Sequence, residues 1–370
     1  MKNIFFSFLL FVSQVVNAQE LAVVGDNKAF GLMNKSGVEV VPAKFNKLGD
    51  FSDGLAPAFD NGKWGFIDDK GNWIINAQYE KVKGFNSGIA LVLKEKTWVY
   101  INKKNETKIF ASTDKLYDFV DGIAFITKDK KVGFIDNTGK TIVAPTYDII
   151  REFVGDYARV KNGTSWGIIN KQGKVIIPLE YEEIGELYKN VTHARKNGLF
   201  GLVINNQFKQ IEGAEKIWDF SDNGLAYAKK GGKIGFVDTK GTWVIEPKFD
   251  KARAFENGLA PVYNGSKWGY VNAKGDVTID YQFSDAEVFS KEGLAPVKLK
   301  KDWGFIDKTG KLVIEDKYQI TVFGFGMFGS GTKGFIDGVA RVKSDKKWGF
   351  LKPDGTVLGK WYDNVELFSK

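Results

Sequence analysis

The chain has 370 residues, of which 43% are hydrophobic, 14% aromatic and 26% charged. This composition is apolar enough for a packed core and excludes a disordered chain. The formal net charge is +8, but the lysines recur beside aspartates and glutamates, which argues against the basic stripe of a nucleic-acid-binding protein. The lack of cysteine excludes disulfides, thiolate chemistry and cysteine-ligated metals.

Residues 1–18 have the pattern of a secretory signal peptide. Lys2 precedes an apolar run over residues 4–16, and the small residue Ala18 ends the segment. We expect cleavage after Ala18, so that the mature chain is residues 19–370 and is secreted, periplasmic or held at the cell surface. The apolar run is too short to span a membrane, and no later stretch reaches the roughly 20 apolar residues of a transmembrane helix.

A unit of about 34 residues repeats through the mature chain. Alignment on the Trp-Gly pairs places Val99 at the equivalent position of the third unit and glycines in the others, at Gly31, Gly65, Gly133, Gly167, Gly201, Gly235, Gly269, Gly304 and Gly349. Successive positions are 34 residues apart seven times, then 35, then 45. The sequence therefore predicts about ten tandem copies of one structural unit over residues 19–370.

Each unit contains three segments with the pattern of short β-strands. In the eighth unit they are residues 258–263, 267–272 and 276–281. The turn before the third segment recurs as Asp68-Asp-Lys-Gly71, in which aspartate caps a type I turn and glycine accepts a positive φ. One carboxylate per turn is too few for calcium. We expect no metal and no cofactor.

The second strand of the unit is apolar on both faces. Trp64 and Phe66 point to one face, and Gly65 and Ile67 point to the other. Such a strand is normally covered on both sides, and one three-stranded meander cannot bury enough apolar surface to fold alone. The units must therefore stack, and we expect an aromatic ring of an adjoining unit to lie over each of these glycines.

The predicted fold is all-β. About ten three-stranded antiparallel β-meander repeats of some 34 residues stack into an open, twisted, solenoid-like array. A closed β-propeller is the alternative. Propellers typically have about four to eight blades of four strands, so ten three-stranded units favour the open array.

The repeated phrase Lys-Trp-Gly-Phe-Ile-Asp resembles the WG (or KWG) repeat family of bacterial secreted and surface proteins. The resemblance covers essentially the whole mature chain and implies a β-repeat architecture with an interaction role, without a particular reaction or ligand. The third and sixth units depart from the pattern, with Trp98-Val99 and Phe200-Gly201. The clearest matches are Lys63-Trp64-Gly65, Trp166-Gly167, Lys267-Trp268-Gly269, Trp303-Gly304 and Lys347-Trp348-Gly349.

The sequence contains no pattern typical of a catalytic centre. His193 is the only histidine and lies in the most divergent repeat; we interpret it as a tolerated surface residue. A glycosidase needs two carboxylates that flank one cleft, and nothing in the sequence brings the clustered acids to one pocket. We therefore expect no enzymatic activity. Those acids are Glu180, Glu182, Glu183, Glu212 and Glu215.

The ten tryptophans suggest a second use, stacking on sugar rings. Six of them occupy the repeat position that we expect in the core, Trp268 among them. The other four, which we expect to be more exposed, are Trp73, Trp218, Trp243 and Trp361. Core packing remains the favoured role for most of these rings.

The long 45-residue spacing marks an insert at about residues 319–337. The glycine-rich segment 324–334 lacks the glycine-lysine-serine/threonine ending of a phosphate-binding loop. It carries Phe323, Phe325, Met327 and Phe328, and inserts in repeat arrays often lie on the binding face. We predict these four residues as the contact site.

The predicted function is that of a non-catalytic binding or scaffolding protein of the bacterial cell envelope. Its partner is expected to be a protein or an envelope polymer and not a nucleic acid. The alternative from another class is a secreted carbohydrate-active or hydrolytic protein that uses carboxylates at the edge of the array. A purely structural spacer is a third hypothesis.

Overall fold

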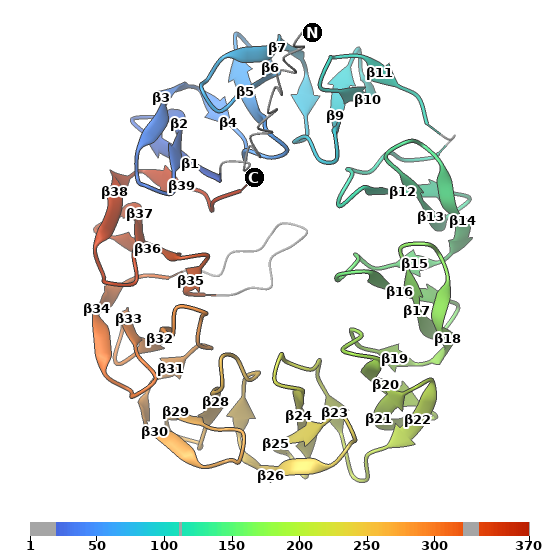
Figure 1. Ribbon diagram of the computed structural model, residues 1–370, viewed down its shortest axis with the longest axis vertical. Helices are drawn as coiled ribbons and strands as arrows, with labels where there is room; N and C mark the ends of the chain where they lie inside the picture. The colour runs from blue at the N-terminus through green and yellow to red at the C-terminus, as the bar shows by residue number, and fades with distance from the viewer. Residues whose placement is uncertain (1–19, 111–112, 321–332, 370) are drawn as a thin grey trace, which may run out of the picture.

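The computed structural model describes residues 20–110, 113–320 and 333–369, and every regular element within these ranges is a β-strand. The strands in this part of the chain form ten small antiparallel sheets. The sheets follow one another around a closed ring, so the fold is a ten-bladed β-propeller (Figure 1). None of the described residues lies in a helix that could cross a membrane.

The blades are numbered from the N-terminus, and each is given with its strands. Blade 1 has β1 (Leu21–Asp26), β2 (Ala29–Asn34), β3 (Glu39–Phe45) and β39 (Asn364–Val365); blade 2 has β4 (Lys47–Leu48), β5 (Ala56–Asp60), β6 (Lys63–Ile67) and β7 (Trp73–Tyr79). Blade 3 has β8 (Lys81–Val82), β9 (Ile89–Lys94), β10 (Thr97–Asn102) and β11 (Thr107–Lys108); blade 4 has β12 (Ile123–Lys128), β13 (Lys131–Asp136) and β14 (Thr141–Tyr147). Blade 5 has β15 (Ile149–Ile150), β16 (Tyr157–Asn162), β17 (Ser165–Asn170) and β18 (Val175–Tyr181); blade 6 has β19 (Glu183–Ile184), β20 (Val191–Lys196), β21 (Leu199–Ile204) and β22 (Gln207–Gln210). Blade 7 has β23 (Lys216–Ile217), β24 (Leu225–Lys230), β25 (Lys233–Asp238) and β26 (Trp243–Phe249); blade 8 has β27 (Lys251–Ala252), β28 (Ala260–Tyr263), β29 (Trp268–Val271) and β30 (Val277–Phe283). Blade 9 has β31 (Asp285–Ala286), β32 (Ala295–Lys298), β33 (Trp303–Ile306) and β34 (Leu312–Tyr318); blade 10 has β35 (Phe335–Ile336), β36 (Val339–Ser344), β37 (Lys347–Leu351) and β38 (Val357–Tyr362).

The ring is closed by a strand from the far end of the chain. β39 pairs antiparallel with β1, with Val365 opposite Val24 and Asn364 opposite Gly25, and the Glu366 N–H donates a 2.8 Å hydrogen bond to the Val23 carbonyl. The open array that the sequence favoured is therefore wrong, and the closed propeller given as its alternative is confirmed.

Most blades have four strands, one more than the repeat pattern predicts. The three predicted strands are present, and the fourth is a two-residue strand such as β4, which lies nearer the centre of the ring than β7 (Figure 1). It pairs through Lys47 opposite Phe59 and Leu48 opposite Ala58. A two-residue strand has no periodicity to detect, so the sequence assigned it to a connector.

The core consists of layers between neighbouring blades. On one face of blade 2, the small side chains of Ala56 and Ala58 pack with Ile67 against blade 1. On the other face, Phe66 and Tyr79 pack against blade 3. Small residues facing large ones allow adjacent sheets to interdigitate, and this confirms the prediction that both faces of the second strand are covered.

An aromatic pair recurs where successive blades meet. The rings of Phe66 and Phe85 lie 4.7 Å apart at an interplanar angle of 66°, and those of Phe236 and Phe255 lie 4.7 Å apart at 63°. Such edge-to-face contacts add to the energy of burial. The connector aromatic therefore joins each of these blades to its predecessor.

The Trp-Gly pair requires glycine because the backbone of the next strand in the same blade, and not a neighbouring ring, occupies the space of a side chain. A Cβ atom at Gly65 would lie 2.3 Å from the carbonyl oxygen of Ile75, on the third strand of the same blade. The register of β6 and β7 shifts at this point, as in a β-bulge. The predicted cover by a ring of an adjoining unit is therefore wrong here. At Gly349 a ring does occupy that space, but it belongs to Trp361 of the same blade.

The aspartate at the start of each predicted hairpin turn caps that turn. Asp136 Oδ1 accepts hydrogen bonds from the backbone N–H groups of Thr138 and Lys140, at 2.9 and 3.0 Å, and from the Thr138 hydroxyl at 2.6 Å. The hydroxyl bond is the largest of the effects that lower the pKa of Asp136. The local hydrogen bonds account for this aspartate without a metal ion.

Candidate functional site

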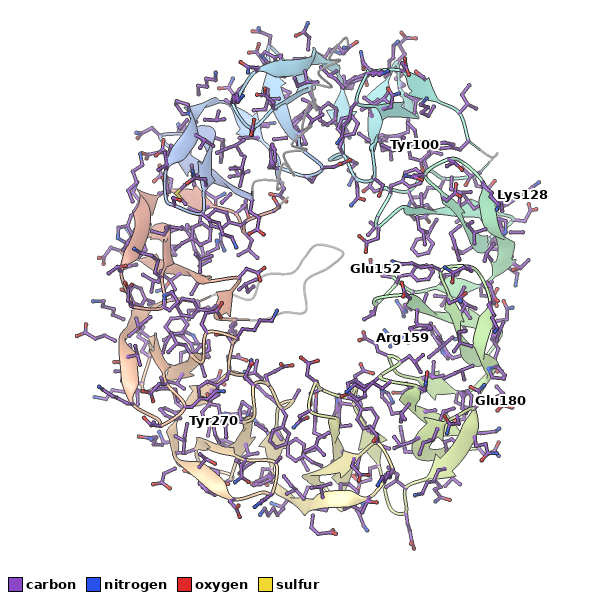
Figure 2. The ribbon with its side chains drawn as sticks, viewed as in Figure 1. Tyr100, Lys128, Glu152, Arg159, Glu180 and Tyr270 are labelled. Atoms are coloured by element: carbon purple, nitrogen blue, oxygen red, sulfur yellow. The ribbon has the colours of Figure 1, made fainter. Side chains whose placement is uncertain are left out.

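The repeats differ from one another chiefly at two positions on the inner side of the ring. The first lies on the strand that precedes the Trp-Gly strand of a blade. Arg159, the third residue of β16 in blade 5, is an example. The second is the residue before the connector aromatic, which is Glu152 before Phe153. Figure 2 shows Glu152 and Arg159 on the inner side, while Lys128 and Glu180 lie at the rim. The two positions of adjacent blades meet, since Arg159 Nη2 lies 3.9 Å from Glu186 Oε1 of blade 6.

Four consecutive blades carry acids where most others carry small or apolar residues. At the position before the connector aromatic, which is Leu187 in blade 6, blades 4 to 7 have Asp118, Glu152, Glu186 and Asp219. Blade 2 also has an acid there, Asp50, whereas blades 1, 3, 8, 9 and 10 have Leu367, Gly84, Ala254, Val288 and Gly334. At the strand position, blades 4 to 7 have Phe125, Arg159, His193 and Tyr227, whereas blades 2, 8 and 9 have Pro57, Pro261 and Pro296, blades 1 and 3 have Val23 and Leu91, and blade 10 has Arg341. The inner side of blades 4 to 7 has therefore diverged from the repeat.

A groove of about 1010 Å³ lies on this inner side and involves blades 3 to 6. Its charged groups include four bases and four acids, and its aromatic residues come from blades 3 and 4. We call it the inner groove. The residues that carry these charges and rings are Lys83, Lys115, Arg151, Arg159, Asp114, Asp118, Glu152, Glu186, Trp98, Tyr117 and Phe125.

The inner groove lies where the repeat is incomplete. The position of the buried Tyr79 in blade 2 is taken in blade 3 by Thr113, which lines the groove. The strand expected next is replaced by a single bridge between Leu116 and Ile126, so blade 4 has three strands in the described part of the chain. The Phe110 ring packs 5.3 Å from Tyr100 and 5.7 Å from Phe119, so the groove accompanies the missing strand and not the loss of a ring.

Asp118 is held in the groove with one oxygen unsatisfied. Burial raises the pKa of its carboxyl. Its Oδ2 atom lies 3.8 Å from Lys83 Nζ, while the buried Oδ1 atom has no hydrogen-bond partner among the described residues. An unpaired buried acceptor costs free energy, so the ionised form of this carboxylate is destabilised where it lies.

Glu186 and Asp219 form a second polar contact at the junction of blades 6 and 7. The Glu186 N–H donates a 2.7 Å hydrogen bond to Asp219 Oδ1. Burial, and then the charge of Asp219, raise the pKa of Glu186. The pKa of Asp219 is lowered, because hydrogen bonds from His193 and from the Glu186 N–H outweigh the effect of its own burial.

His193 is buried, which corrects its assignment to the surface. Its side chain is 7% exposed, and Nε2 lies 3.1 Å from Asp219 Oδ1. Nδ1 is buried without a hydrogen-bond partner in the described ranges. The repeat around it diverges because Asp219 and Gly185 accommodate the imidazole; a Cβ atom at Gly185 would lie 2.2 Å from the ring. The repeat therefore differs here because it holds the contact between His193 and Asp219, and not because a surface histidine is tolerated.

The acids that the sequence singled out do not meet in a pocket. Glu180 pairs with Lys196 at 2.9 Å, and Glu182 pairs with Arg195 at 3.2 Å. Within the described residues, no group of three or more histidines and acids is placed to hold a metal ion. Position-by-position comparison of the repeats would have indicated Asp118 and Glu152, which the sequence analysis did not single out.

The insert falls on the inner strand of blade 10. Phe323, Phe325, Met327 and Phe328 lie outside the described residues. Before them, Gln319 bridges to Lys343 of blade 10, and after them comes β35, which Figure 1 shows on the inner side of the ring.

The repeat tryptophans are partly or fully buried, and several are covered by cations. Trp268 is 7% exposed, with the Arg253 guanidinium 5.0 Å from its ring centroid. Trp218, expected to be more exposed, stacks on Tyr227 at 4.6 Å and 16°. These contacts leave few tryptophan faces free for a sugar ring.

Replacement of Asp118 by asparagine should make the protein more stable at neutral pH. Since burial raises the pKa of Asp118 from 3.8, its ionised form destabilises the fold at pH 7, and stability recovers as the pH falls through the raised pKa. We expect Asp118→Asn to raise the free energy of unfolding at pH 7 by about 1 kcal/mol, measured by urea denaturation. The gain should shrink near pH 4.

Asp136→Asn is the matched control for that experiment, because hydrogen bonds lower the pKa of Asp136. It should destabilise the protein at pH 7, opposite in sign to Asp118→Asn. A less stable Asp118→Asn protein at pH 7 would show that the ionised carboxylate is satisfied within the fold.

Comparison with known proteins adds a family. A family model described as WG containing repeat matches residues 30–64, 64–98, 133–163, 166–200, 234–268, 268–301 and 303–319. No curated protein matches the chain. A solved eukaryotic initiation factor is 12% identical with a TM-score of 0.42, over 80% of this chain and 95% of that one.

Two solved bacterial proteins are also similar. The extracellular domain of a putative hybrid two component system from B. thetaiotaomicron is 10% identical with a TM-score of 0.33, over 93% of this chain and 69% of that one. PorZ from Porphyromonas gingivalis, a surface component of the type-IX secretion system, is 10% identical with a TM-score of 0.28, over 87% of this chain and 52% of that one. Likeness of this degree carries no argument about ligand or activity.

Proposed function

The chain belongs to the WG containing repeat family, and from this premise we propose that it is a non-catalytic binding or scaffolding protein of the bacterial cell envelope. Its partner is a protein or an envelope polymer that enters the inner groove. The N-terminal signal peptide, cleaved after Ala18, exports it to the periplasm or the cell surface.

The observation that carries this proposal is the concentration of repeat differences at one place. A spacer role does not require acids to gather at one position of consecutive blades. Here acids replace small or apolar residues in blades 4 to 7, and a groove with four bases, four acids and three aromatic rings adjoins them. Mixed charges and aromatic side chains favour specific recognition of a macromolecular surface.

The hydrolase alternative has less support. The acids on which it depended pair with bases, as Glu215 does with Lys229 at 3.5 Å. In the groove itself, Glu186 and Arg159 lie 3.9 Å apart, so that carboxylate is placed beside a permanent cation. Burial raises the pKa of Glu186, as a general acid requires, but the Arg159 guanidinium acts against that shift, and a glycosidase would also need a second carboxylate across the same cleft.

A photo-crosslinking experiment tests the groove as the binding surface. Val154 is 52% exposed and lines the inner groove, while Val175 is 44% exposed and begins β18 at the rim of the same blade. Replacing either valine with p-benzoylphenylalanine gives two matched probes. With an envelope extract of the source cell, we expect a saturable crosslinked species from position 154 and none from 175.

Equal labelling from the two positions, or none from either, would contradict the groove as the binding surface. The insert remains a predicted contact site. It is tested with a separate variant, the chain without residues 322–333. If that deletion abolishes the crosslink from position 154, the contact also involves Phe323, Phe325, Met327 or Phe328.

A further inference from the structure

A small pocket opens beside the inner groove, where the connectors of blades 4 and 5 meet. It encloses about 40 Å³, which is room for about three water-sized positions and suits the head of one side chain. Its lining comprises three carboxylates, three aromatic rings and two aliphatic side chains, without a basic residue. The acids are Asp118, Asp121 and Glu152, and the rings belong to Tyr117, Phe125 and Phe153.

The aromatic side chains form a corner and not a closed stack. The rings of Tyr117 and Phe125 are nearly perpendicular, at 86°, with centroids 6.4 Å apart. The π faces of such rings attract cations, and carboxylates beside them accept hydrogen bonds from the same group. A pocket with both features has the chemistry of an organic cation site.

Among the described residues, no base lines this pocket. Lys83 contacts only Oδ2 of Asp118, at 3.8 Å, and Lys115 lies 4.6 Å over Tyr117. Both lysines line the neighbouring groove and not the small pocket. Oδ1 of Asp118 is buried without a partner, and no described base pairs with Asp121 or Glu152.

Elsewhere in the ring the chain fills such a site with its own base. Arg253 lies 5.0 Å over Trp268 and contacts Asp285 at 3.0 Å. Lys333 lies 4.7 Å over Trp303 and contacts Glu287 at 2.7 Å. At the equivalent repeat position of blade 5 a base is also present, since Arg151 lies 5.7 Å over Trp166. The small pocket combines rings and carboxylates at a different position, and its lining contains no base.

We propose that this pocket binds the guanidinium or ammonium head of an arginine or lysine side chain that belongs to a polypeptide lying in the inner groove. The pocket and the groove share Tyr117, Asp118, Phe125 and Glu152, so a chain in the groove can place one side chain in the pocket. The inference rests on the proposed binding function and names its partner as a protein segment with an exposed base.

Isothermal titration calorimetry with synthetic peptides tests the inference on the mature chain. The probe is a nonapeptide of glycine and serine with a central arginine, and its neutral isostere carries citrulline at that place. We expect the arginine peptide to bind at least tenfold more tightly than the citrulline peptide, since loss of a charged hydrogen bond typically costs about 1.5–3 kcal/mol. N-acetylarginine amide should bind about tenfold more weakly than the peptide.

Variants locate the binding. Glu152→Gln and Asp121→Asn should each weaken the arginine peptide about tenfold and leave the citrulline peptide unchanged, while Glu180→Gln at the rim should change neither. Equal affinity of the two peptides, no measurable binding, or indifference to both pocket substitutions would overturn the inference. Equal affinity of N-acetylarginine amide and the peptide would assign the pocket to a free small cation instead.

The outcome can be separated from that of the crosslinking experiment. A crosslink at position 154 together with equal peptide affinities would preserve the groove as a binding surface and reject only the cation pocket. Selective arginine binding without that crosslink would preserve the pocket and reject the groove as the site of the envelope partner.

Discussion

Removal of residues 364–370 should destabilise the whole ring and not only its last strand. The deletion removes β39, the fully buried Val365 and Phe368, whose ring lies 4.9 Å from that of Phe350. Phe368 is partly buried, so its loss costs less than the roughly 3–5 kcal/mol of a fully buried aromatic side chain, but the loss of Val365 and of the pairing partner of β1 adds to it. We expect the free energy of unfolding to fall by more than about 5 kcal/mol, measured by urea denaturation.

Small-angle scattering provides the second readout for this deletion. A ring opened between blades 1 and 10 should show a larger radius of gyration, while removal of Lys370 alone should change neither stability nor size. If the deletion left both unchanged, closure by β39 would contribute nothing, and the propeller would behave in solution as the open array that the sequence favoured.

The strands and turns of the unit could be predicted because each depends on a short stretch of sequence. The turn from Asp68 to Gly71 is an example: the Asp68 carboxylate accepts the Lys70 and Asn72 N–H groups at 2.9 and 2.8 Å, and Gly71 has φ +79°. Both features follow from side-chain reach and from the conformational freedom of glycine. The apolar second strand likewise required a neighbour on each face.

Closure of the ring could not be predicted, because it depends on the sum of small rotations between all blades. No single unit carries that information, and the pairing of Val24 with Val365 joins residues at opposite ends of the chain. The two-residue strands could not be predicted for another reason. A segment such as Lys47–Leu48 gains its conformation by pairing with Ala58 and Phe59 and not from its own pattern.

The candidate site was not predicted, because it consists of residues that differ between the repeats, whereas the prediction was drawn from the residues that the repeats share. The shared residues, such as Phe66, form the core. The residues that differ at equivalent positions, such as Asp118 against Gly84, line the inner side of the ring. In a tandem repeat the other copies supply the comparison that one sequence otherwise lacks, and the exceptions to the pattern then point to the surface that has specialised.

Trp268→Ala should cost about 3–5 kcal/mol of unfolding free energy, as is typical of a buried aromatic side chain. The ring is 7% exposed and packs against Tyr263 at 5.5 Å beneath Arg253, at 5.0 Å. Its removal leaves a cavity in a close-packed layer and exposes that guanidinium's contact face. Urea denaturation at neutral pH measures the loss, and Trp268→Phe, which keeps a ring in the layer, should recover part of it.

Trp361→Ala is the comparison, and the structure changes what is expected of it. We expected Trp361 to be more exposed, but it lies on β38 and stacks on Tyr318 at 6.3 Å and 20°. Because it is only partly buried, its loss should cost about 1–2 kcal/mol, less than full burial of such a ring provides. Equal losses from Trp268→Ala and Trp361→Ala would mean that the repeat tryptophan has no special place in the core. The stability of the ring would then depend on Phe66 and its equivalents, which lie deeper between the blades.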